Sequence, residues 1–401
     1  MPPHEDHLAD YCARNYLSPA GEGGIHQAYG GLLRDRPAPR APISGDCQLE
    51  DMKREIRTAV AAGPDGFTVD LLDLSAAGPH RKRVHLLVKA AEQVDPGFRI
   101  VLMPDMTATR IKGLDAAGLA SERAGLAKSP SVCKLPDGRV VVSPFKAENR
   151  TADWYAAFNY ENYASVSYGL SNWGNRSPNL QVGLGGDIGA SHGLGKIWMQ
   201  PVAVQDERPN QEVYDEANNT ENLRTTWQNA IDGGTDRVRL TTWNDFSEGT
   251  QFAPSPHNDG AYLDLASYYL TRLKTGKRPA IARDTVYLTH RTQTAGLKPT
   301  SGGQTKFMVP RSGTATPRDK VEVLTFLAAA AQIKATIGGT ASSYDAAAGV
   351  QAKLFPLAAG ANAASVTRNG ATAATVTSPF RVTATPPVQD LQYHAAGSGR
   401  P

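Results

Sequence analysis

The feature that most constrains the fold of this chain is an alternation of helix-like and strand-like segments between residues 50 and 250. In the stretch 50–62, Met52, Ile56 and Val60 recur at a spacing of four, which predicts an amphipathic helix. Short apolar runs lie between such stretches and predict strands that are buried on both faces. Helices alternating with strands build a parallel sheet covered by helices, so we expect an α/β protein. Helices are predicted at 50–62, 85–94, 118–128, 153–163, 220–231 and 262–274, and strands at 65–72, 98–105, 139–145, 165–173, 196–204 and from 237.

Acidic, amide and aromatic side chains gather where these predicted strands end. The set consists of Asp70, Asp105, Lys146, Asn172, Trp173, Trp198, Gln200, Trp243, Asn244, Asp245 and Glu248. In a (β/α) barrel the carboxyl ends of all strands lie on one face, where the active site is found. Acids cleave bonds, amides hold hydroxyl groups, and indole rings stack on pyranose faces. Any one of these residues taken alone is also explained by packing, but their joint occurrence favours a carbohydrate site.

The stretch 237–250, RVRLTTWNDFSEGT, concentrates this chemistry. It begins as a strand with alternating side chains and ends in Trp243, Asn244, Asp245 and Glu248. Hydrolysis of a sugar linkage needs two carboxyl groups, one to protonate the leaving oxygen and one to activate water or attack carbon. The alternative is that Asp245 serves the backbone of a turn and that Glu248 is a solvated loop acid.

Composition excludes several other classes of function. The chain has 401 residues, enough for two or three domains, and a net charge of +3, too small to indicate binding to nucleic acid or to an anionic membrane. Its three cysteines, Cys12, Cys47 and Cys133, are expected to be buried free thiols. No apolar run reaches about 18 residues, and the polar start of the chain does not resemble a secretory signal.

Cofactor and metal motifs are also not apparent. The glycine-rich stretch 183–189 follows no predicted strand, no histidine pair has metal-ligand spacing, and no nucleophile elbow occurs. We therefore expect no cofactor and no metal, and a monomer. His26 lies in a long Gly- and Pro-rich N-terminal loop, where a hydrogen-bonded structural histidine is favoured over a substrate contact.

The composition changes after residue 294. A Gly-, Ser- and Thr-rich linker is expected at 295–305, and the short alternating segments of 306–401 predict a small β-sandwich. With few aromatic residues and no acidic cluster, this domain fits a structural appendage better than a sugar-binding module. The predicted organisation is therefore a domain at 1–294, a linker at 295–305 and an accessory domain at 306–401.

Several stretches together resemble glycoside hydrolase family 71, the endo-α-1,3-glucanases or mutanases, and especially its bacterial members. They include YLSPAGEGGIHQAYGGLLRDRP, VVSPFKAE, YGLSNWGNRSP, GKIWMQPVAVQDERPNQEVYDEANNTENLR and TTWNDFSEGTQFAPS, within roughly residues 11 to 293. The resemblance implies a TIM barrel with an accessory β-domain, and cleavage of internal α-1,3-glucosidic bonds of an α-glucan with inversion. It implies that Asp245 and Glu248 are the catalytic acids. We assign Glu248 as general acid and Asp245 as general base, with the reverse left open, and Asp70 and Asp105 as supporting residues.

The chain departs from the family pattern in its strand count, because six barrel strands are predicted where the family has eight. We expect the first and the fifth strand to be missing. Two alternatives therefore accompany the glucanase prediction. One is a non-catalytic relative that binds α-glucan or persists as a truncated remnant. The other is a glycosidase of different linkage, such as an endo-mannanase-like enzyme. The substrate is a polymer outside the cell, so the function implies export.

Overall fold

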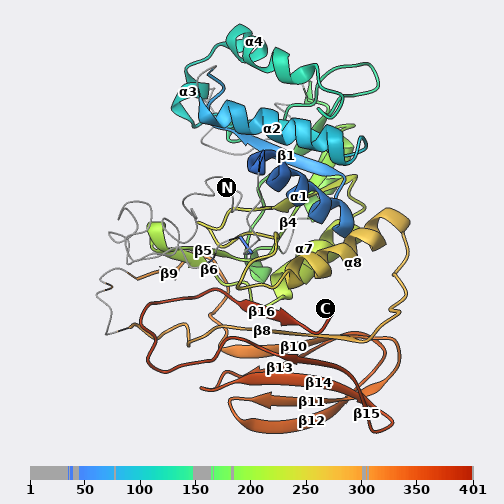
Figure 1. Ribbon diagram of the computed structural model, residues 1–401, viewed down its shortest axis with the longest axis vertical. Helices are drawn as coiled ribbons and strands as arrows, with labels where there is room; N and C mark the ends of the chain where they lie inside the picture. The colour runs from blue at the N-terminus through green and yellow to red at the C-terminus, as the bar shows by residue number, and fades with distance from the viewer. Residues whose placement is uncertain are drawn as a thin grey trace. The chain divides into compact units, whose positions relative to one another are not determined.

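A computed structural model describes residues 35, 37–38, 45–75, 78–147, 164–165, 167–181, 185–299, 304 and 307–399. The chain divides into two compact units (Figure 1). Among the described residues, 45–147 belong to the first unit, and 35–38 together with 164–399 belong to the second. The predicted helix at 153–163 and the N-terminal loop with His26 lie outside the described residues.

The first unit confirms the predicted order of helices and strands. Its elements are α1 (Cys47–Ala62), β1 (Gly66–Leu71), α2 (Pro79–Val94), β2 (Arg99–Pro104), α3 (Thr109–Lys112) and α4 (Ala116–Ala127). Asp46 caps α1 by accepting a hydrogen bond from the backbone of Leu49, and Gly63 ends the helix in the left-handed conformation. β1 and β2 pair in parallel, with Gly66 opposite Arg99. The helix periodicity and the order of the strands could therefore be predicted from the sequence. The expected full burial is found over most of β2 but not in β1, where Leu71 is the one buried residue.

The predicted strand at 139–145 is wrong as a regular strand. This stretch makes only isolated parallel bridges to the first sheet, between Leu102 and Val142 and between Asp105 and Phe145. The chain doubles back just before it, because Leu135 donates a backbone hydrogen bond to Arg139 in a tight turn. The two bridged positions are three residues apart on each segment, so they do not form a continuous ladder.

The second unit contains the other predicted parallel strands. They are β3 (Gly169–Ser171), β4 (Ile197–Ala203) and β7 (Arg237–Thr241), which form one parallel sheet in the order β3-β4-β7. The helical elements around them are η4 (Pro178–Gln181), α6 (Gly185–Gly193), α7 (Glu221–Asp232) and α8 (Ala261–Thr275). Leu223 and Trp227 of α7 are both fully buried, as their spacing predicts. The polar stretch after β4 forms an unpredicted hairpin of β5 (Asp206–Arg208) and β6 (Val213–Asp215), joined by η5 (Pro209–Gln211) and extended by β9 (Val309–Pro310).

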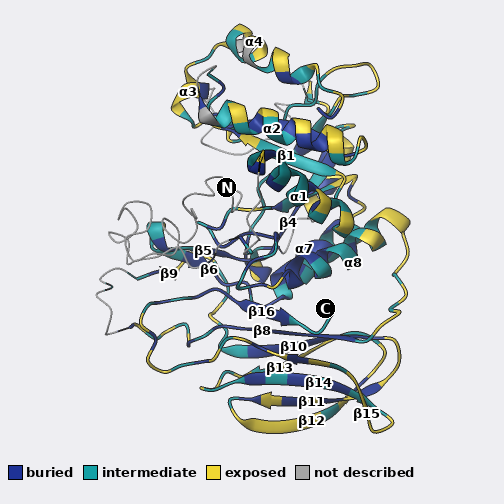
Figure 2. Cartoon of the chain, in the orientation of Figure 1, coloured by how far each residue is buried: buried dark blue, intermediate teal, exposed yellow. Residues whose placement is uncertain are grey.

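The C-terminal half of the second unit consists of two four-stranded antiparallel sheets with the orders β13-β10-β8-β16 and β12-β11-β14-β15. Their strands are β8 (Thr285–His290), β10 (Lys320–Leu327), β11 (Ala331–Ile337), β12 (Thr340–Ala346), β13 (Gly349–Pro356), β14 (Asn362–Arg368), β15 (Ala371–Thr377) and β16 (His394–Gly397). Both sheets contribute to one hydrophobic cluster, which includes Leu288, Val323 and Ile333. Figure 2 shows β8 buried and β12 largely exposed.

A second hydrophobic cluster joins these sheets to the parallel sheet and its helices. It contains Val202 of β4, Trp227 of α7, Tyr262 of α8, Tyr287 of β8 and Ala395 of β16. β8, which the sequence placed in the first domain, pairs with β10 and β16. Its neighbours are antiparallel strands, so β8 belongs to the C-terminal sheets.

The mixed α/β class is thus confirmed. The described residues contain parallel sheets of two and three strands, and no closed eight-stranded barrel is formed among them. Of the helices described, none is long and apolar enough to span a membrane.

Candidate active site

The loop after β7 holds the two predicted catalytic acids in one turn. Its ends are tied together, because Thr242 donates its backbone N–H to the carbonyl of Thr250 at 3.0 Å. The backbone N–H of Asp245 donates to the hydroxyl of Thr242 at 3.1 Å, and the Ser247 hydroxyl donates to Asp245 Oδ1 at 2.6 Å. Asp245 therefore does serve a turn, as the structural alternative expected, but its carboxylate remains half-buried and close to Glu248 in the chain.

An arginine from the hairpin links Glu248 to a second acid. Arg208 Nη1 lies 2.6 Å from Glu248 Oε1. The same guanidinium binds both oxygens of Asp206, through Nε at 2.8 and 2.9 Å and Nη2 at 2.7 Å. The backbone N–H of Glu207 also donates to the carbonyl of Glu248 at 2.8 Å. The hairpin thus fixes the position of Glu248 through both its side chain and its backbone.

The electrostatic surroundings make Glu248 an unusual carboxyl group. Burial, followed by the neighbouring Asp245 carboxylate, raises the pKa of Glu248 from its ordinary value of 4.5 to about 7. Arg208 opposes this rise, but much of its charge is already balanced by the bidentate contact with Asp206. Glu248 is therefore protonated in mildly acidic solution, as a general acid must be.

Two further arginines surround the end of β3. Arg239 lies 4.9 Å from the ring of Trp173 and donates to the carbonyl of Asn172 at 2.7 Å. Arg176 is buried and donates to the carbonyls of Trp173 and Gly174. Burial lowers the pKa of Arg239 to about 10, with the charge of Arg176 adding to the effect. The Trp173 ring is thus half-buried and lies next to the guanidinium groups of Arg176 and Arg239.

Asn172, Trp243 and Asn244 complete the polar set at the ends of β3 and β7. The Asn172 amide donates to Asp187 at 3.1 Å and its oxygen accepts from the backbone of Gly174. Asn244 is exposed, and Trp243 is half-buried. Both directly precede Asp245 in the same turn.

Two predicted substrate contacts are contradicted by the structure. Trp198 is fully buried among Leu170 and Ile188, and its indole N–H donates to Gln200 at 2.6 Å. Gln200 is itself only 1% exposed. Residues of a strand buried on both faces point into the core along much of its length, which the strand-end argument ignored. A ring without accessible surface has no face to offer a sugar.

Three predicted residues lie in the first unit. Asp105 accepts hydrogen bonds from the backbone N–H and the hydroxyl of Thr107, both at 2.7 Å, and thereby begins a turn. Asp70 is exposed on β1, and Lys146 is exposed with a positive φ of 47°. Asp245 and Glu248 lie in the second unit, whereas Asp70, Asp105 and Lys146 lie in the first unit.

Sequence reasoning missed Arg208 and Asp206 as members of the site. The only local signal was the polar composition of 205–219, in which acids alternate with an arginine. Arg208 and Glu248 are far apart in the chain, so only the folded hairpin brings them together. Arg311, which directly follows β9, adds a further cation beside Asp206 and Asp215.

A carboxyl group protonated near neutrality, beside a second carboxylate at the end of a parallel strand, is the arrangement by which glycosidases cleave sugar linkages. The sequence model of glycosyl hydrolase family 71 matches residues 173–394, which is more than half of the chain. The protein therefore belongs to glycosyl hydrolase family 71. The match extends to residue 394, so it includes most of the C-terminal sheets, which the sequence had separated as an accessory domain.

Comparison with solved structures gives distant similarities. The chain is similar to the GH99 endo-α-mannosidase from Bacteroides thetaiotaomicron, with 13% identity, a TM-score of 0.48, and coverage of 66% of this chain and 96% of that one. It is also similar to a glycosyl hydrolase family 2 member from Bacteroides cellulosilyticus, with 12% identity, a TM-score of 0.39, and coverage of 82% and 43%. A search of curated proteins gives no match.

Proposed function

We propose that this glycosidase cleaves internal α-1,3-glucosidic bonds of an α-glucan and inverts the anomeric centre. The observation that carries the proposal is the pair of Glu248 and Asp245 in one turn, with the pKa of Glu248 raised to about 7 by burial and by Asp245. Family membership supports the reaction class. The linkage follows from the resemblance of the motifs around residues 196–250 to the α-1,3-glucanases.

In this proposal Glu248 is the general acid. In its protonated form it donates its proton to the glycosidic oxygen as the bond to the anomeric carbon breaks. Asp245 is the general base, which takes a proton from a water molecule that attacks the opposite face of the sugar. The hydroxyl of Ser247, which donates to Asp245 Oδ1, supports an ionised carboxylate and leaves the other oxygen for water. Arg208 is a positioning residue, since it holds Glu248 without reaching the reacting bond in this scheme.

We further propose that sugar rings are held near Trp173, Trp243, Asn172 and Asn244, which lie at the ends of β3 and β7. Asp70, Asp105 and Lys146, which belong to the first unit, are kept as candidates for substrate binding. Trp198 and Gln200 are omitted, because both are buried. The enzyme is proposed to act as a monomer. The parallel strands and their helices are elements from which barrels are built, and a barrel-like fold with a C-terminal β-sandwich remains our proposal for the architecture.

Release of reducing ends from insoluble α-1,3-glucan tests this function. Glu248→Gln and Asp245→Asn should each lower kcat by about 10²- to 10⁴-fold, since each removes a proton-transfer group. Asp232→Asn, at an exposed carboxylate of α7, is the matched control and should retain full activity. The anomeric form of the first product, followed by proton NMR, tests inversion.

Two outcomes would contradict the proposal. A folded wild-type chain that binds α-glucan and releases no sugar would favour the non-catalytic alternative. Preferential cleavage of an α-mannan in a panel of α-linked polysaccharides would favour a glycosidase of a different linkage.

A further inference from the structure

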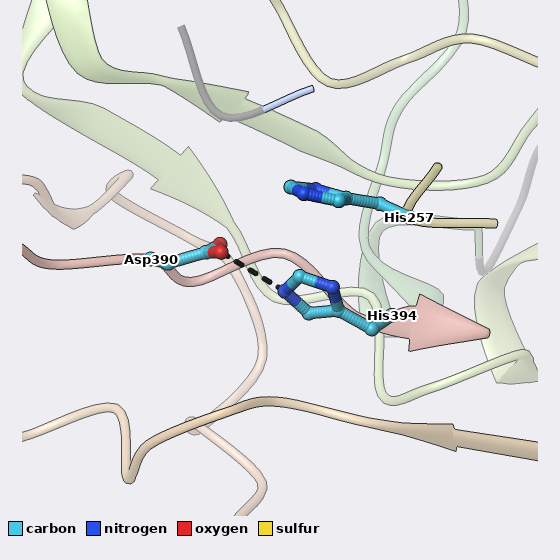
Figure 3. Close-up of side chains that lie close together, drawn as sticks. All are labelled: His257, Asp390 and His394. Carbon is cyan, nitrogen blue, oxygen red and sulfur yellow. Dashed lines mark hydrogen bonds and ion pairs between the residues drawn. The ribbon is translucent and has the colours of Figure 1, made fainter. Parts of the chain in front are cut away.

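A histidine-rich cluster lies outside the residues used so far. His257 is in the loop before α8, Asp390 is in the segment before β16, and His394 is the first residue of β16. One ligand atom from each residue lies within 4.8 Å of the other two. Figure 3 shows the three side chains close together, with Asp390 and His394 on one stretch of chain and His257 on another. The spacing of the two histidines in the sequence does not predict a metal site, because they are far apart in the chain.

One pair in this cluster has a hydrogen bond of ordinary length, whereas the contacts of His257 are long. His394 Nε2 lies 2.9 Å from Asp390 Oδ2, while its Nδ1 is buried and has no hydrogen-bond partner within the described part of the chain. His257 Nδ1 lies 3.3 Å from Gln392 Oε1 and 3.8 Å from Asp35 Oδ1, so both contacts are long.

The charges around the two imidazoles favour a cation. Asp35 and Asp390 both face His257, and Asp35, Asp390 and Glu207 face His394. Carboxylates therefore outnumber the two rings in this part of the described structure. A cation bound between the rings would balance these carboxylate charges.

The two imidazole rings pack against an aromatic side chain, and one of them is partly exposed to solvent. Phe380 packs against both histidines, with ring centroids 5.5 Å from His257 and 4.3 Å from His394. The His257 side chain keeps 21% of its surface exposed. An ion can therefore reach the cluster from solvent.

We infer that His257, Asp390 and His394 form a binding site for a divalent transition-metal ion, with Zn²⁺ as the best match. Two imidazoles and one carboxylate are ligands that Zn²⁺ accepts, and a water molecule can complete a tetrahedron. Ligand atoms around such an ion stand about 3.4 Å apart, since each lies about 2.0–2.1 Å from the metal. The Asp390 and His394 atoms are already close enough, and a small rotation of the loosely held His257 ring would bring in the third ligand.

The position of the site gives the ion a structural role. His257 belongs to the loop that leads into α8, and the other two ligands frame the entry into β16. The residues between them contact the β5–β6 hairpin, because Leu391 donates its backbone N–H to the carboxylate of Glu207 at 3.0 Å. A bound ion would cross-link the α8 loop to the C-terminal sheet beside the hairpin that positions Glu248. This role does not depend on the substrate or on turnover.

The test is metal binding by the full-length protein, measured without reference to activity. After removal of metal with a chelator, the protein is titrated with Zn²⁺ in a calorimeter at about pH 7.5, where both histidines can lose their protons. We expect one Zn²⁺ per chain and a rise in Tm of about 5–10 °C at saturating metal. Co²⁺ in place of Zn²⁺ should give the visible absorption of a four-coordinate ion. Affinity should fall as the pH is lowered, because protons compete with the metal for the imidazole nitrogens.

Variants locate the site. His257→Ala and Asp390→Asn should each weaken Zn²⁺ binding at least about 10-fold and abolish the rise in Tm, since each removes one ligand or its partner. His192→Ala is the matched control, because His192 pairs with Asp236 at the surface and is remote in sequence from the cluster. The proposal is wrong if the folded wild type binds no stoichiometric Zn²⁺, or if both ligand variants bind it as tightly as the control.

Discussion

Replacing Arg208 tests whether the electrostatics of the site set the working pH of the enzyme. Arg208 Nη1 lies 2.6 Å from Glu248 Oε1, and its charge opposes the burial that raises the pKa of Glu248 to about 7. With roughly 4 Å between the centres of charge and an effective dielectric constant of about 20, the interaction is about 4 kcal/mol. Because Arg208 also binds both oxygens of Asp206, we assign half of this, about 2 kcal/mol, to Glu248, or about 1.5 pKa units.

Arg208→Met should therefore raise the pKa of Glu248 to about 8.5. A general acid works only while protonated, so the alkaline limb of the pH–rate profile marks its pKa. In the wild type, kcat should fall as the pH rises through about 7. In Arg208→Met the same fall should appear about 1.5 pH units higher, even if the maximal rate is reduced.

The assay is reducing-sugar release from α-1,3-glucan across the pH range, on protein shown to be folded by circular dichroism. Arg208→Lys is the matched control, since it keeps the charge and loses the bidentate geometry, and its limb should stay close to that of the wild type. Alkaline limbs at the same pH in all three proteins would refute the assignment of Glu248 as the acid tuned by Arg208. A downward shift in Arg208→Met would refute the electrostatic argument itself.

Three further predictions concern stability and binding. Because the pKa of Glu248 is higher in the folded chain than its ordinary 4.5, the contribution of this group to stability is fully present below about pH 4.5 and is lost as the pH rises through about 7. Glu248→Gln should equal the wild type below this window and exceed it by about 3 kcal/mol above it, which urea unfolding at several pH values would measure. Trp173→Ala should lower kcat/KM about tenfold with little change in Tm, because its ring is half-buried. Trp198→Ala should cost about 3–5 kcal/mol of folding free energy, because its ring is fully buried. The reverse pattern would contradict the placement of both rings. Arg291→Met should cost about 3–5 kcal/mol in denaturant unfolding, since it leaves the carboxylate of Glu216 buried without the partner that lies 2.8 Å away.

The parts of the fold that depend on local pattern could be predicted from the sequence. Leu223 and Trp227 stand four residues apart, and this spacing alone placed α7 and its buried face. β7 was evident from the alternation that precedes Trp243, and the resemblance of that stretch led to the family. In each case the signal and the structure lie within one short segment.

The parts that depend on distant contacts could not be predicted. The β5–β6 hairpin consists of strands of three residues with charged side chains, too short and too polar for a hydrophobic period to appear. Arg208 was consequently not recognised as a partner of Glu248. Trp198 was misjudged for a related reason, since a strand-end tryptophan in the sequence looks the same whether its ring faces solvent or the core.

Because β8 belongs to the C-terminal sheets, the chain cannot be divided at the predicted linker without separating paired strands. β8 precedes the predicted linker at 295–305, while both of its neighbours, β10 and β16, follow it. The compositional change in the sequence is therefore no seam in the fold. A recombination event that exchanged everything after residue 305 would strip β8 of both partners and remove Leu391 from Glu207, beside the catalytic turn. A chain trimmed at the predicted linker would keep β8 without its partner strands and would lose part of the scaffold beside Glu248.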